Sequence, residues 1–103
     1  MDSIAPRAAL LLELTRNEGY GLELIDRVAK RTNGELKLSQ ATVYPELRAM
    51  EREGLVESSE SEPLPERGGR PRRYYKLTAE GRRAARAVMH SVSSMIAGEF
   101  QWA

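Results

Sequence analysis

The 103-residue sequence contains no cysteine and a single histidine, His90. Without cysteine there is no disulfide framework and no thiolate chemistry, and one histidine leaves little for a transition-metal site. The longest apolar run, at residues 8–12, is far shorter than the roughly 20 residues that a membrane span requires. No basic segment followed by an apolar stretch opens the chain, as a signal peptide would. We therefore expect a cytoplasmic protein with no metal, no cofactor and no membrane association.

The sequence also lacks the residue arrangements of an enzyme. Serines lie close to His90, but residues a few positions apart on one helix do not form a nucleophile, a base and an orienting group that converge in a pocket. The glutamates of residues 57–66 fall in a predicted strand and loop, without the buried setting that a general acid needs. There is no phosphate-binding loop and no dinucleotide fingerprint. We expect no catalytic activity.

What the chain does have is enough apolar residues for one small domain and an uneven distribution of charge. Hydrophobic residues make up 41% and charged residues 30%, which is typical of a globular domain. The formal net charge is +1, but residues 67–86 hold eight basic residues and one acidic residue, whereas residues 46–66 hold seven acidic and two basic ones. A short cationic segment in a nearly neutral chain is typical of a surface that meets phosphates, and the alternative is a solvated charged loop.

Two helices are predicted in the first third of the chain. The first is capped by Ser3, has Pro6 in its first turn, where the missing N–H is harmless, and ends before Gly19. Its apolar positions are Ile4, Ala8, Leu11, Leu12 and Leu14. The second ends at residues 32–34, which accept left-handed backbone geometry. Its apolar stripe is Leu22, Ile25, Val28 and Ala29.

A third helix is predicted after a short alternating segment, residues 36–38, which is a candidate edge strand. Ser39 offers a hydroxyl that caps this helix, and Gly54 ends it. Its buried stripe is Val43, Leu47 and Met50. Pro45 breaks a local rule, because a proline this deep in a helix removes one backbone hydrogen bond and costs up to about 3 kcal/mol. Our hypothesis is that a kink at Pro45 re-aims Tyr44 and the first turn.

A β-hairpin and a long last helix complete the prediction. Residues 55–58 and 73–77 form two strands, joined by a loop rich in proline and glycine. We call this hairpin, residues 55–77, the wing. Thr78 caps a last helix that runs to about Phe100 and, at about 1.5 Å per residue, is about 30 Å long. Three helices, a wing and a last helix are typical of a mainly α winged helix-turn-helix with a small β-hairpin, in which the third helix enters the major groove.

Three segments of the sequence form a specific pattern: YGLELI at residues 20–25, LSQATVYPEL at 38–47 and GGRPRRYYKLT at 68–78. Together they resemble the PadR family of bacterial transcriptional regulators. The resemblance implies a homodimer that represses promoters, often until a small-molecule effector binds. The chain is similar to the short type of the family, with a single C-terminal dimerisation helix. The family commonly has tyrosine where this chain has Leu22, so a contact made by that tyrosine does not carry over.

The third helix and the wing supply the candidate DNA contacts. These are Ser39, Gln40, Thr42, Tyr44 and Arg48 on the helix, and Arg70, Arg72, Arg73 and Lys76 in the wing. Gln40 can bind adenine, Thr42 can contact a thymine methyl, and Arg48 can reach guanine or phosphate. Ser39 and the free N–H groups beside it can bind a phosphate. The alternatives are that Ser39 is only a cap and Tyr44 only a core aromatic.

Alternation along the second strand of the wing separates its side chains into two faces. One face carries Arg72, Tyr74 and Lys76, and the other carries Arg73, Tyr75 and Leu77. We therefore expect one of the two tyrosines in the core. Gly68 and Gly69 permit a tight tip, and Arg70 matters most if that tip enters the minor groove.

The last helix carries the predicted dimer contacts, which are Val88, Met89, Val92, Met95, Ile96 and Phe100. Part of this apolar surface can pack on its own domain, and we expect the remainder to bury against a second copy in an isologous dimer. Two such recognition helices address half-sites about 34 Å apart on a palindrome. An alternative role for Phe100 and Trp102 is an aromatic pocket for a planar effector.

The sequence thus predicts a DNA-binding domain at residues 1–78 and a dimerisation helix at residues 79–103. The expected partners are double-stranded DNA with a palindromic operator, a second copy of the chain and a small-molecule effector. A different class of function remains open, in which the winged helix is a protein–protein interaction module and the acidic residues 46–66 form its working surface.

Overall fold

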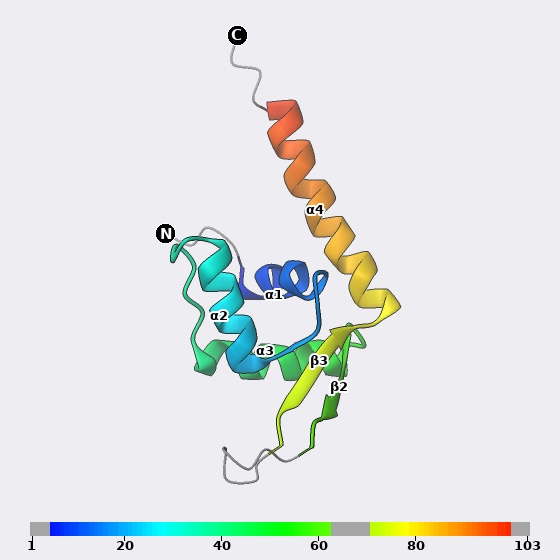
Figure 1. The fold of residues 1–103 in the computed structure, drawn as a ribbon. Helices are drawn as coiled ribbons and strands as arrows, with labels where there is room; N and C mark the ends of the chain where they lie inside the picture. Colours follow the sequence, from blue (N-terminus) through cyan, green and yellow to red (C-terminus); the bar gives the residue numbers. More distant parts are fainter. Residues whose placement is uncertain (1–4, 63–70, 100–103) are drawn as a thin grey trace.

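The computed structural model of the chain describes residues 5–62 and 71–99 and has a winged-helix architecture. In chain order the elements are α1 (Pro6–Leu14), β1 (Gly19–Tyr20), α2 (Gly21–Arg31), α3 (Gln40–Arg52), β2 (Val56–Glu60), β3 (Arg73–Leu77) and α4 (Ala79–Glu99). Helices α1, α2 and α3 pack together, the hairpin of β2 and β3 extends from one side of them, and α4 extends in the opposite direction (Figure 1). The predicted fold class, mainly α with a small β-hairpin, is confirmed.

The sheet has three antiparallel strands in the order β1-β3-β2. Its two edge strands are β1, where Tyr20 lies opposite Tyr74, and β2, so the prediction of an edge strand at residues 36–38 is wrong. That segment connects α2 to α3 instead. The N–H of Leu36 donates to Oγ1 of Thr32 at 3.0 Å, and Leu38 packs against the core. Its alternating pattern therefore reflects side-chain packing and not strand pairing.

The helix boundaries follow local signals in the sequence. Ser39 accepts a hydrogen bond at its Oγ from the N–H of Thr42 at 3.2 Å, which confirms the cap of α3. Thr78 caps α4 in the same way, with its Oγ1 3.0 Å from the nitrogen of Gly81. Gly54 follows the end of α3 with a φ of 80°. The predicted cap of α1, Ser3, lies outside the described residues.

Two details of the helices differ from the sequence prediction or go beyond it. In α2 the buried positions are Gly21, Leu24 and Val28, whereas Leu22 is 39% exposed, so the predicted stripe is wrong at that residue. The reason is that α2 packs closely through Gly21, which has no side chain and so is missing from any apolar pattern.

Helix α3 continues through Pro45 without a break, and the predicted kink at this residue stays a hypothesis.

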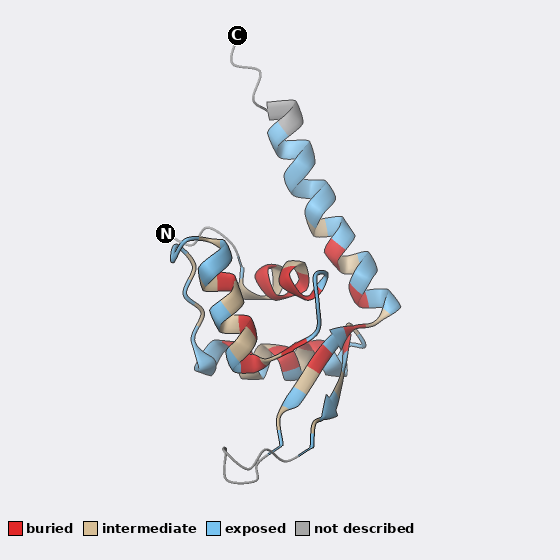
Figure 2. Cartoon of the chain, viewed as in Figure 1, coloured by how far each residue is buried: buried red, intermediate tan, exposed pale blue. Residues whose placement is uncertain are grey.

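The core lies where α1, α2 and α3 meet the sheet and the first half of α4 (Figure 2). Its buried members are Leu10, Leu11, Leu14, Leu24, Val43, Leu47, Met50, Val56, Tyr75, Leu77 and Ala85. The predicted stripe of α3 is therefore confirmed, as is the burial of one wing tyrosine. Gly81 lets α4 begin against the turn between α3 and β2, because a Cβ there would lie 2.0 Å from the carbonyl oxygen of Leu55.

Candidate nucleic-acid interface

The first turn of α3 presents short polar side chains on the surface. Ser39, Gln40 and Thr42 are exposed. The Ser39 hydroxyl, which caps the helix, also donates to Oγ1 of Thr42 at 3.1 Å, so these two side chains form one local unit. Gln40 makes no side-chain hydrogen bond within the described part of the chain, which leaves its amide available to a base edge.

Tyr44, expected to be either a DNA contact or a core aromatic, is neither fully buried nor fully exposed. The side chain is partly buried, and its ring packs on the start of α2, where a Cβ on Gly21 would lie 2.2 Å from Cε1 of Tyr44. The same ring lines the groove between α3 and the wing. Tyr44 is thus both a packing residue and part of the candidate interface, and any side chain larger than hydrogen at residue 21 would displace it.

An ion-pair cluster, which the sequence analysis missed, holds α3 against α1. Arg7 donates from Nη1 and Nη2 to the two carboxylate oxygens of Glu53 at 2.6 and 2.9 Å, and its Nε pairs with Glu46. These contacts raise the pKa of Arg7, and the guanidinium lowers the pKa of Glu53. Glu46 and Glu53 are seven residues apart on one face of α3, and that spacing is the only signal the sequence offers.

The wing cations fall into distinct environments. Arg73 pairs with Glu60, its partner in the strand register, at 2.8 Å and donates to the Ser58 hydroxyl at 2.9 Å. Lys76 is exposed on β3. Arg70, together with Gly68 and Gly69, lies outside the described residues.

Arg72 is held on the face of an aromatic ring. Its Cζ lies 4.4 Å from the ring centroid of Tyr20, and that ring meets Tyr74 edge-on, with centroids 5.3 Å apart and an interplanar angle of 74°. The strand register explains this cluster. Tyr20 lies opposite Tyr74 and is therefore diagonal to Arg72, which is two positions before Tyr74. Tyr20 is the first residue of the YGLELI segment that carries the family resemblance, and no role for its side chain was predicted.

A groove of about 380 Å³ joins α3 to the wing. It is lined by Tyr20, Gly21, Leu22, Tyr44, Arg48, Pro71, Arg72, Arg73 and Tyr75. Within the part of the chain that the structure describes, this lining has three arginines, three tyrosines and no acid. Burial raises the pKa of the Tyr75 hydroxyl. The groove is suited to an anion.

Comparison with known proteins decides the family. The family model described as "Transcriptional regulator PadR-like family" matches residues 10–87, which covers the second half of α1, all of α2 and α3, the wing and the first part of α4. The chain belongs to the PadR-like family. Members of this family are transcriptional regulators and not enzymes, which bears out the expectation that the chain has no catalytic activity.

Solved structures of PadR-like proteins have the same fold. A PadR family transcriptional regulator from Eggerthella lenta is 30% identical, with a TM-score of 0.71, over 88% of this chain and 75% of that one. A PadR-like transcription factor from Bacteroides fragilis is 24% identical, with a TM-score of 0.76, over 94% and 88%. Bacillus subtilis PadR in complex with operator DNA is 18% identical, with a TM-score of 0.71, over 81% of this chain and 45% of that one.

The second half of α4 in this PadR-like chain has an uncovered apolar face. Met89 and Val92 are 42% and 44% exposed, and Met95 and Ile96 are 63% and 57% exposed. Figure 2 shows this part of α4 standing clear of the domain. Val88, by contrast, packs partly against the core. Phe100 and Trp102 lie outside the described residues, and the dimer stays a prediction.

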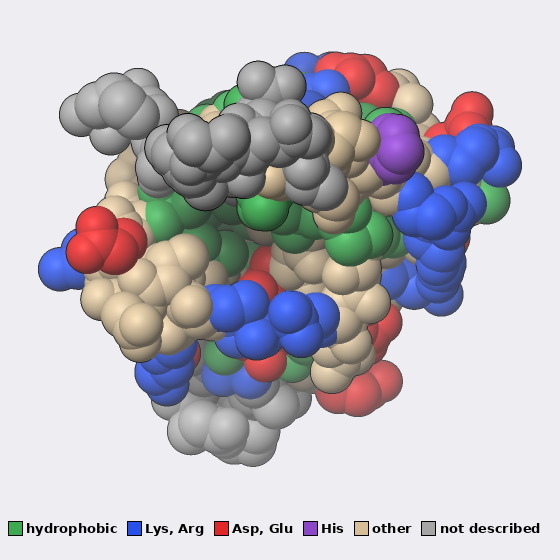
Figure 3. Space-filling model, turned by 90° about the horizontal axis from the view of Figure 1, so that it is seen from above, with side chains coloured by type: hydrophobic (Ala, Val, Ile, Leu, Met, Phe, Trp, Pro, Cys, Tyr) green, Lys and Arg blue, Asp and Glu red, His purple; other side chains and the backbone are tan. Residues whose placement is uncertain are grey.

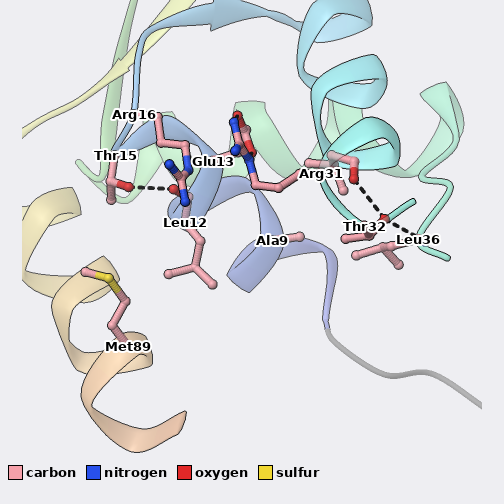
Figure 4. A pocket seen from close by; sticks show the side chains of 10 residues that line it. Ala9, Leu12, Glu13, Thr15, Arg16, Arg31, Thr32, Leu36 and Met89 are labelled. Carbon is pink, nitrogen blue, oxygen red and sulfur yellow. Dashed lines mark hydrogen bonds and ion pairs between the residues drawn. The ribbon is translucent and has the colours of Figure 1, made fainter. Parts of the chain in front are cut away.

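A second cavity, of about 330 Å³, lies between α1, α2 and α4. Met89 of α4 stands at one end and Leu36 at the other (Figure 4). In Figure 3 apolar side chains gather in a hollow of this surface, bordered by basic side chains. Glu13 lines the cavity although it is 3% exposed, and it pairs with Arg27 at 3.0 Å and Arg31 at 2.7 Å. The bond from Arg31 is the main cause of the lowered pKa of Glu13.

The acidic residues that the structure describes between 46 and 62 do not form an uninterrupted acidic surface. Glu46 and Glu53 neutralise Arg7, Glu60 pairs with Arg73, and Glu51 accepts a hydrogen bond from the Ser58 hydroxyl at 2.7 Å. Several of these carboxylates therefore have partners within the fold, which weakens the alternative of an acidic protein-binding face.

Within residues 5–62 and 71–99, no helix combines the length and apolar character needed to cross a bilayer. Over the same ranges, no group of three or more histidine, aspartate or glutamate side chains is placed to hold a metal ion.

Proposed function

We propose that this PadR-like chain is a repressor that binds a palindromic promoter site as a homodimer. The observation that carries the proposal is the groove lined by Arg48 of α3 and by Arg72 and Arg73 of the wing, with no acid among the described residues that line it. Bacillus subtilis PadR, solved with operator DNA, shares the fold and supports the same class of partner. A bacterial regulator of this kind acts in the cytoplasm, where the DNA lies.

In this proposal residues 1–78 form the DNA-binding domain. The contacts are Ser39, Gln40, Thr42, Tyr44 and Arg48 of α3, and Arg70, Arg72, Arg73 and Lys76 of the wing. Gln40 and Thr42 supply base contacts, because both are exposed at the start of the helix. The arginines and Lys76 supply phosphate contacts, which add affinity without sequence preference.

Residues 79–103 form the dimerisation helix in the same proposal. The exposed apolar face of α4 supports it, since unpaired apolar side chains of this size mark a protein contact. A small-molecule effector releases the DNA, and Phe100 and Trp102 are its candidate contacts. The cavity between α1, α2 and α4 is a further candidate, because Met89 connects it to the dimerisation helix.

A salt titration of binding to duplex DNA tests the proposal. If the protein neutralises about 6–10 phosphates, its affinity falls by about 10³–10⁵ between 50 and 200 mM salt. The measurement is fluorescence anisotropy of a labelled duplex. A protein–protein interaction module would bind DNA weakly at every salt concentration, and that result would favour the acidic-surface alternative.

A further inference from the structure

The groove between α3 and the wing lies where a DNA backbone has to pass. In B-DNA one sugar–phosphate backbone separates each major groove from the adjacent minor groove. A helix in one groove and a wing in the next therefore straddle that backbone. In this chain Arg48 lies on the helix side of the space and Arg72 on the wing side.

We propose that this groove binds a single backbone phosphate between Arg48 and Arg72, and that Tyr20 is the positioning residue for Arg72. The inference rests on the proposed function and names the DNA group that occupies one part of the site. Tyr20 is the last residue of β1 and directly precedes α2. No local pattern in the sequence predicts its contact with Arg72.

Arg72 is fixed at both its backbone and its side chain. Its N–H donates to Oγ of Ser61 at 3.0 Å, and its carbonyl accepts the N–H of Ser61 at 2.7 Å. The guanidinium lies 4.4 Å above the ring of Tyr20. Tyr74 meets this ring edge-on from the neighbouring strand. Two elements, β1 and β3, thus hold one cation at the border of the groove.

A stacked guanidinium is well suited to a phosphate. The ring covers one face of the guanidinium plane, while the N–H donors lie in that plane and point outward from its edge. Stacking and hydrogen bonding to an oxyanion are therefore compatible. Because the side chain is already ordered, less conformational freedom is lost on binding.

The other two arginines that line the groove, Arg73 and Arg48, have different surroundings. Arg73 is engaged by Glu60 and Ser58 across the hairpin, so part of its charge is already balanced. Arg48 is exposed and forms no ion pair among the residues that the structure describes. Because Arg48 lines the groove from α3 and the stacked Arg72 lines it from the wing, these two arginines are the pair assigned to the phosphate.

The test uses the full chain and a labelled duplex of random sequence, about three helical turns long. The slope of log K against log salt is measured for wild type, Arg72→Gln, Tyr20→Leu, Tyr20→Phe and the double variant. We expect Arg72→Gln to lower the magnitude of the slope by about 0.9 for each protomer bound. Tyr20→Leu lowers it in the same direction, whereas Tyr20→Phe keeps the ring face and the wild-type slope.

The double variant Tyr20→Leu with Arg72→Gln is expected to bind as Arg72→Gln does, because Tyr20 acts through Arg72. Lys30→Ala is the matched control, since this exposed cation at the end of α2 pairs only with Asp26 in the described structure and lies outside the groove. Its slope should equal that of wild type. Thermal unfolding followed by circular dichroism checks each fold, and Tyr20→Val, which favours a strand, replaces Tyr20→Leu if that variant does not fold.

The outcomes separate this inference from the proposed function. A shallow slope for wild type overturns DNA binding itself. A steep wild-type slope that Arg72→Gln leaves unchanged overturns the phosphate site and leaves DNA binding intact. Equal losses in Tyr20→Phe and Tyr20→Leu, or additive losses in the double variant, overturn the positioning role of the ring.

Discussion

Glu13 lies in an apolar helix, yet its carboxylate is buried and paired with two arginines of α2. Arg27 also donates to the backbone carbonyls of Asn17 and Glu18, at 2.9 Å each. The cluster therefore fixes α2 and the start of the β1 loop against α1. A single buried carboxylate thus links the domain's first two helices, beside the apolar side chains that they share in the core.

We expect Glu13→Gln to destabilise the fold by about 2 kcal/mol, because charge-assisted hydrogen bonds to two arginines are lost. The pKa of Glu13 is lowered in the folded state, so its contribution is complete above the unfolded pKa and is lost as the pH falls through the folded pKa. The difference between wild type and Glu13→Gln should therefore shrink in acid. Urea unfolding at several pH values measures it, and a constant difference across acidic pH would contradict this account.

In the proposed function, α3 and the wing make different kinds of contact with DNA. The start of α3 carries an exposed amide and a threonine, which can distinguish bases. The groove between α3 and the wing is cationic, and phosphate contacts do not depend on sequence. Arg7 and its two glutamates hold α3 in place from the side of α1.

We expect Gln40→Ala to change which sequences are bound, at a cost of about 1–3 kcal/mol at one base pair of each half-site. Arg73→Ala should instead weaken binding to all sequences by a similar factor, since it removes only charge. Selection of bound oligonucleotides, followed by affinity measurements on the selected and altered sites, distinguishes the two effects. A uniform loss in Gln40→Ala would mean that this residue does not bind a base.

At the scale of the whole molecule, α4 is longer than its own domain can cover. Its first half packs through Ala85 into the core, and its second half exposes four large apolar side chains. A second copy related by a two-fold axis is the simplest occupant of such a face. The spacing of the two recognition helices, and with it the operator, would then depend on how two α4 helices cross.

We expect the double substitution Met95→Glu and Ile96→Glu to convert a micromolar dimer to a monomer, because charges are costly in a buried apolar contact. Sedimentation velocity measures the change, and affinity for a palindromic site should fall with it. Ser94→Glu is the control, since it adds a charge to the same helix on the side away from the apolar face. Sedimentation of wild type as a monomer would contradict the dimer.

Much of the fold follows from signals that lie within a few residues. The caps at Ser39 and Thr78, the ends at residues 32–34 and Gly54, and the strand at residues 73–77 were all predictable, because each depends on local backbone chemistry. The stripe of α3 and the exposed polar residues at its start follow from helical periodicity. The family resemblance, carried by contiguous motifs, is confirmed by the comparison.

The remainder depends on which residues meet across the fold. No local rule brings Arg7 to Glu53, or Tyr20 to Arg72, since these partners are 46 and 52 positions apart and their contacts arise only after α1, β1 and β3 have packed. The burial of Gly21 in place of Leu22 was hidden for a similar reason, because the close approach of Tyr44 requires a missing side chain. The sequence by itself determined the four helices, the two strands of the wing, their order and the cationic character of the wing, but not the strand β1. Tertiary structure decided which cations are held and which are neutralised, because ion pairs and ring contacts depend on distance in space and not on distance along the chain.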